Sequence, residues 1–67
     1  MKTRYKVIDT YEEPIDLGGS NTIEGVKRIV RKRIKDTDGE CQCVYAELEP
    51  ATNTYDWKNF RLMLIVR

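Results

Sequence analysis

Hydrophobic and polar residues alternate in the first and last thirds of the chain and recur at helical spacing in between. Residues 3–11 alternate β-branched or aromatic side chains with charged ones, which predicts a β-strand. Residues 40–48 alternate in the same way and predict a second strand, with Val44 on one face and Cys43 on the other. Residues 57–66 are apolar at nearly every position, which favours a strand at the centre of a sheet.

A helix is predicted between the first two strands, over residues 22–35. At about 100° per residue its apolar side chains fall within an arc of roughly 140°. These side chains are Ile23, Val26, Ile29, Val30 and Ile34. Asn21 is the expected N-cap, with Glu24 completing a capping box. Pro14 and the pair Gly18–Gly19 indicate that the segment before the helix is a turn-rich loop.

The order strand, helix, strand, strand predicts a single α+β domain over residues 1–67. With short connections, the expected sheet has three antiparallel strands in the order 1-3-2 and one helix packed on one face. The other face would then lack a cover, and Met63, Ile65, Ile8 and either Cys43 or Val44 are the candidates to lie on it. An open apolar face on so small a domain indicates a homodimer or a protein partner.

Length and composition exclude several classes of protein. The chain has 67 residues, of which 40% are hydrophobic and 34% charged, which is typical of a small folded domain and not of a disordered segment. No apolar run approaches the roughly 20 residues of a membrane-spanning helix, and no apolar stretch of a secretory signal follows the basic start. We therefore expect a cytoplasmic protein with no membrane partner.

Few residues with catalytic or metal-binding chemistry are available. The chain contains no histidine, and its two cysteines, Cys41 and Cys43, are poorly spaced for a disulfide and too few for a closed zinc site. No nucleophile and base can be paired. Two pairs of carboxylates, Glu12 with Glu13 and Glu47 with Glu49, are interpreted as surface charge unless an oligomer builds a cleft around them. We expect no catalytic residues, no metal, no cofactor and no enzymatic activity.

The net charge of +1 conceals a strong segregation of charge along the chain. Residues 27–35 carry six positive charges and residues 36–57 carry six negative ones. Five cations of the predicted helix lie opposite its apolar arc: Lys27, Arg28, Arg31, Lys32 and Lys35. Such a face contacts phosphates or an acidic protein surface, or it is an ordinary solvated face. Arg33 falls inside the apolar arc, so it either extends past the end of the sheet to solvent or pairs with a carboxylate such as Glu47 or Asp9.

Aromatic residues gather in the connection before the last strand. Tyr and Trp are frequent interface hot spots, so Tyr55, Trp57 and Arg61, with Met63 and Ile65 on the open face, form the candidate protein-binding set. Trp57 could equally fold back to cap the core.

Two hypotheses on function follow. The first is a non-enzymatic protein-interaction module, an inhibitor or adaptor of a larger cytoplasmic machine. In its small size and its lack of histidine and of any motif, the chain resembles accessory proteins of phages and mobile elements. The alternative is a nucleic-acid-binding domain that uses the basic helix face, although no known nucleic-acid-binding motif is present.

Overall fold

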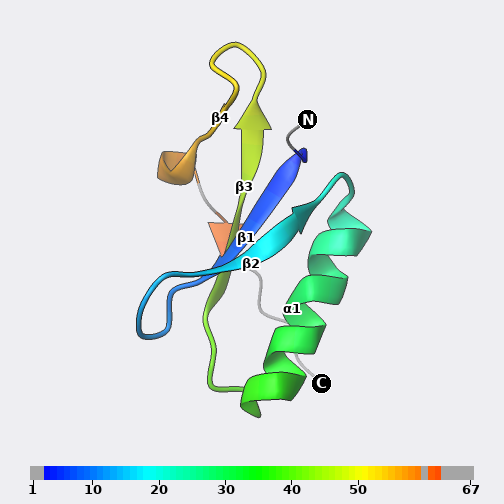
Figure 1. Cartoon of the computed structure of the whole chain (residues 1–67), viewed down its shortest axis with the longest axis vertical. Coiled ribbons are helices and arrows are strands. Elements are labelled where there is room, and N and C mark those ends of the chain that lie inside the picture. Colours follow the sequence, from blue (N-terminus) through cyan, green and yellow to red (C-terminus); the bar gives the residue numbers. More distant parts are fainter. Residues whose placement is uncertain (1–2, 60, 63–67) are drawn as a thin grey trace.

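One helix and an antiparallel sheet make up the structure, a computed structural model that describes residues 3–59 and 61–62 (Figure 1). The elements are β1 (Tyr5–Asp9), β2 (Ile15–Ser20), α1 (Ile23–Thr37), β3 (Cys43–Glu49), β4 (Thr54–Tyr55), the 3-10 turn η1 (Trp57–Asn59) and β5 (Arg61–Leu62). The strand order is β2-β1-β3-β4, and β5 also pairs with β3. Because β4 and β5 lie along one edge of β3, the sheet has four strand positions.

The α+β class with one helix is confirmed, but the predicted number and order of strands are wrong. Residues 43–49 pair directly with β1, so β3 and not the last strand separates the first strand from the rest. Cys43, Val44 and Ala46 are at most 4% exposed, which shows that β3 is buried on both faces. Half of the apolar run over residues 57–66, which favoured a central last strand, lies outside the described residues.

β2 occupies the segment that the sequence indicated as a loop. Gly18 has φ +98°, a conformation in which other residues are strained, and it stands where the β1–β2 register shifts. A Cβ at Gly19 would overlap Thr3 and the backbone oxygen of Tyr5. The two glycines therefore allow a bulged edge strand to lie close against β1.

The pairing of β1 with β3 sorts side chains onto two faces. Val7 lies opposite Tyr45, so the odd-numbered residues of both strands share one face. This face packs on α1, where Val7, Val26 and Val30 are each 0% exposed. The alternation predicted for the second strand is confirmed, and Val7 rather than Ile8 is the inward residue of β1.

The helix and its N-cap each lie one residue later than predicted, at Ile23 and Thr22. The Thr22 side chain accepts a hydrogen bond from the backbone N–H of Gly25 at 3.1 Å and is the N-cap. Asn21 instead accepts from the backbone N–H of Arg4 at 3.0 Å, which ties the loop before α1 to the start of β1. At its other end the helix stops at Asp38 in the left-handed conformation.

A buried ion pair joins α1 to the sheet. Asp9, 2% exposed, accepts hydrogen bonds from the backbone N–H groups of Tyr11 and Gln42 and from Nε of Arg33, at 2.8–3.0 Å. This confirms pairing with a carboxylate for Arg33, and the carboxylate is that of Asp9. Burial acts to raise the pKa of Asp9, but the three hydrogen bonds and the guanidinium charge outweigh it and hold the pKa below its ordinary value of 3.8.

α1 has 15 residues, and the described part of the chain contains no helix long and apolar enough to cross a membrane.

We expect Asp9→Asn to lower the free energy of unfolding by about 3 kcal/mol, because it leaves the Arg33 guanidinium without its carboxylate at a buried site. Asp16→Asn is the matched control. Asp16 also accepts from a backbone N–H, that of Gly18, and pairs with Lys6 at 2.8 Å, but its side chain is 58% exposed. Its substitution should cost less than about 1 kcal/mol. Urea unfolding followed by circular dichroism measures both, and equal losses would contradict a special role for Asp9.

The contribution of Asp9 should also depend on pH. Since the folded chain lowers the pKa of Asp9, its stabilisation is complete above the ordinary value of 3.8 and is lost as the pH falls through the lower folded value. The difference in unfolding free energy between wild type and Asp9→Asn should therefore be constant above about pH 5 and shrink between about pH 4 and pH 2. Urea titrations across this range test this, and a constant difference down to about pH 2 would show that the charge of Asp9 contributes nothing.

Candidate functional site

The exposed face of α1 carries a row of four cations. Arg28, Arg31, Lys32 and Lys35 follow i, i+3, i+4, i+7 spacing and are all exposed. At about 1.5 Å per residue the row is about 10 Å long. In the described part of the chain none of the four forms an ion pair or a side-chain hydrogen bond. We call these four residues the α1 stripe.

Four other cations of the described residues are paired with acids. Arg4 pairs with Glu47 at 3.3 Å and Lys6 with Asp16 at 2.8 Å. Lys27, which the sequence placed on the same basic face, is half-buried and pairs with Glu24 at 3.7 Å. With Arg33 held by Asp9, the α1 stripe stands out as the place where several unpaired cations gather on one element.

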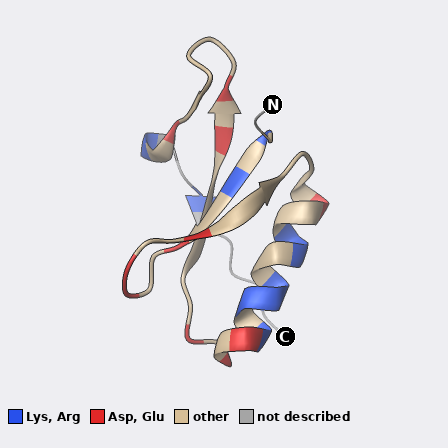
Figure 2. Ribbon diagram, viewed as in Figure 1, with Lys and Arg blue, Asp and Glu red and all other residues tan. Residues whose placement is uncertain are grey.

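Acids limit the stripe at both ends. Figure 2 shows positive residues along the middle of α1 and negative ones at its two ends. Glu24 lies in the first turn, and Asp36 and Asp38 lie in and just after the last. The result is a short cationic surface with sharp boundaries and not a continuous basic track.

The aromatic connection is folded onto the sheet. The Tyr55 hydroxyl donates to the backbone oxygen of Thr3 at 2.7 Å, and its ring lies 5.9 Å from Nζ of Lys6. Trp57 is half-buried, with its ring 6.3 Å from that of Tyr55. Of the candidate protein-binding set, Arg61 is exposed on β5, and Met63 and Ile65 lie outside the described residues. Tyr55 and Trp57 thus have structural contacts of their own.

The sheet face away from α1 is covered over β3. Val44 and Ala46 point to this face and are 4% and 1% exposed. Cys43, named as the alternative to Val44, lies on the helix side in the core. The expectation of an open apolar face is therefore wrong at this strand.

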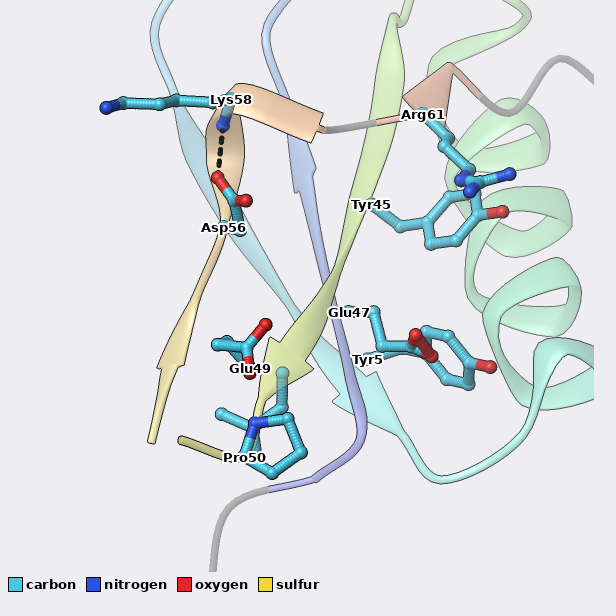
Figure 3. A pocket seen from close by; sticks show the side chains of 9 residues that line it. Tyr5, Tyr45, Glu47, Glu49, Pro50, Asp56, Lys58 and Arg61 are labelled. Carbon is cyan, nitrogen blue, oxygen red and sulfur yellow. Dashed lines mark hydrogen bonds between the residues drawn. The ribbon is translucent and has the colours of Figure 1, made fainter. Parts of the chain in front are cut away.

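An open pocket of about 810 Å³, which the sequence did not indicate, lies along the end of β3. Figure 3 shows the rings of Tyr5 and Tyr45 side by side on one side of β3, with Glu49 and Asp56 on the side of β4. The two rings meet edge to face at 5.9 Å, and the guanidinium of Arg4 lies 5.4 Å from the Tyr5 ring. An internal cation thus occupies the aromatic surface that a cationic ligand would use.

The two cysteines lie at the entry to β3, near Arg33. Burial raises the pKa of the Cys43 thiol to about 12, and the neighbouring Cys41 adds to the shift. Cys43 is therefore a protonated core thiol at neutral pH. Among the described residues, no group of three or more potential ligands could hold a metal ion.

The hairpin between β1 and β2 exposes two large hydrophobic residues beside acids. Tyr11 is 55% exposed and Ile15 is 44% exposed. With Glu12, Glu13 and Glu40 they line a small pocket of about 240 Å³. The sequence analysis missed this surface, because it assigned Tyr11 to a strand and residues 12–19 to a loop. In the sequence, the local indication of this surface was an aromatic residue, Tyr11, followed directly by Glu12 and Glu13.

Comparisons of the chain with protein families, with curated proteins and with solved structures find no match.

We expect Tyr55→Phe to lower the free energy of unfolding by about 1 kcal/mol, because it removes the hydroxyl that bonds to Thr3. Tyr11→Phe, at an exposed tyrosine, is the matched control and should change stability by less than about 0.5 kcal/mol. Thermal and urea unfolding measure both variants. If Tyr55→Phe is as stable as wild type, the hydroxyl does not stabilise the connection, and Tyr55 becomes available as a contact residue.

Proposed function

We propose that the protein is a non-enzymatic protein-interaction module that binds the acidic surface of a partner protein through the α1 stripe, acting as an inhibitor or adaptor. The observation that carries the proposal is the row of four exposed, unpaired cations on one helix, in a chain whose other helix and β1 cations are paired. Long side chains on a rigid helix can meet a matching set of carboxylates with little rearrangement.

The boundaries of the stripe favour a protein over nucleic acid. A DNA duplex carries one negative charge per about 1.7 Å of its axis, so its phosphates continue past a row about 10 Å long. Glu24 at one end and Asp36 at the other would then face phosphates. A protein partner can end its acidic patch where the stripe ends and meet the flanking acids with cations of its own. Such a pattern fixes the orientation of binding more than its strength.

The proposal is tested with poly-L-glutamate as a model acidic polypeptide. We expect fluorescently labelled poly-L-glutamate to bind at low salt and to bind at least about tenfold more weakly to Arg31→Glu/Lys32→Glu. The matched control is Arg4→Glu/Lys58→Glu, which changes the net charge equally but leaves the stripe intact. It should keep its affinity within about twofold, and circular dichroism verifies that both variants fold.

Two outcomes would overturn the proposal. Equal losses in the two variants would show that net charge and not the stripe determines binding. Duplex DNA or RNA bound at least about tenfold more tightly than poly-L-glutamate, with the same sensitivity to Arg31→Glu/Lys32→Glu, would assign the stripe to nucleic acid.

A further inference from the structure

A surface complementary to the α1 stripe exists on the chain itself, at the end of the β1–β2 hairpin. It consists of Tyr11, Glu12, Glu13, Ile15 and Glu40, which line one pocket together with Thr37 and the Asp9–Arg33 pair. We call the first five residues the acidic tip. In the described part of the chain, its three glutamates form no ion pair, since Arg33 is paired with Asp9. The surface therefore combines three carboxylates that have no salt-bridge partner with two exposed apolar side chains.

The chemistry of the acidic tip suits the side chains of the stripe. Arginine and lysine bury their aliphatic stems on apolar surface while their charged ends reach carboxylates. The ring of Tyr11, 55% exposed, can accept a guanidinium over its face, and Ile15, 44% exposed, can pack against the stems. The acidic tip is a match in charge and in apolar surface for a row of long cationic side chains.

Within one copy, neither the stripe nor the glutamates of the acidic tip take part in the ion pairs of the described residues. The net charge is only +1, so two copies do not repel each other at long range. A chain near neutrality with unpaired charge of both signs on separate surfaces is prone to associate with itself.

We propose that the α1 stripe docks on the acidic tip of a second copy of this chain. The inference rests on the proposed function, because it names the second copy as the acidic protein partner of the stripe. Four cations of one copy then face the three glutamates of the other, and Arg31 or Arg28 lies over Tyr11. Since each copy carries both surfaces, a contact can form in both directions between two copies.

A charge-swap experiment tests the contact. Masses are measured by sedimentation equilibrium at low ionic strength, about 50 mM salt, where exposed charges are weakly screened. We expect wild type to exceed the monomer mass of 7.9 kDa. Arg31→Glu/Lys32→Glu alone and Glu12→Lys/Glu13→Lys alone should each stay monomeric. Their equimolar mixture should associate again, because each reversed surface then meets its complement.

A control variant distinguishes the effect of reversing one surface from the effect of changing the net charge. Arg4→Glu/Lys58→Glu carries the same net charge as Arg31→Glu/Lys32→Glu and leaves both surfaces intact, so it should associate like wild type. A wild type that stays at 7.9 kDa, or two single-surface variants that associate as wild type does, would overturn the inference. If poly-L-glutamate binding is still lost in Arg31→Glu/Lys32→Glu, that result leaves the proposed function standing and removes only the second copy as partner.

Discussion

The buried contact of Asp9 with Arg33 determines how the helix lies on the sheet. The Asp9 carboxylate accepts hydrogen bonds from the backbone N–H groups of Tyr11 and Gln42 and from the guanidinium of Arg33. A charge this far from water is stable only when its acceptor positions are filled, so all three donors must be held together. The end of β1, the entry to β3 and the last turns of α1 thereby meet at one point.

This contact also determines which residues of α1 face water. With Arg33 turned toward Asp9 and Val26 and Val30 buried against β1, the rotation of the helix about its axis is fixed. The residues at i, i+3, i+4 and i+7 from Arg28 are then on the outer surface. The cationic stripe is thus a consequence of the same helical period that builds the core, and its exposure requires no loop or further element.

The sequence predicted local features well and long-range pairing poorly. The helical period located α1, and it placed Arg33 on the wrong side for a solvated cation, which was enough to name Asp9 among its possible partners but not to choose it. The position of β3 was not predictable from alternation, because alternation shows which residues share a face and not which strand is the neighbour. β2 was missed since paired glycines are rare in strands, and here Gly18 provides a bulge and Gly19 a close approach.

The candidate sites show the same contrast between local features, which the sequence predicted, and long-range contacts, which it did not. The cations of the stripe could be named from spacing alone, but Lys27 was not separable from them until the contact with Glu24 was known. Tyrosine is a common residue type at interface hot spots, which made Tyr55 a candidate. Its hydroxyl, however, donates a hydrogen bond to the backbone oxygen of Thr3, 52 residues away. A contact over this separation cannot be predicted from a local sequence pattern. The acidic tip was missed because its exposed apolar residues belong to segments interpreted separately, as a strand and as a loop.

The distribution of ion pairs connects stability with recognition in this chain. Arg4, Lys6 and Arg33 each pair with an acid of another element, so each pair joins two parts of the fold. The cations of the α1 stripe and the glutamates of the acidic tip take part in no ion pair of the described residues, and they form two surfaces of opposite sign. If these surfaces meet a partner as proposed, charge complementarity fixes the orientation of the contact more than its strength. Neither surface includes Asp9 or the buried valines, so substitutions in the stripe leave the core around Asp9 intact.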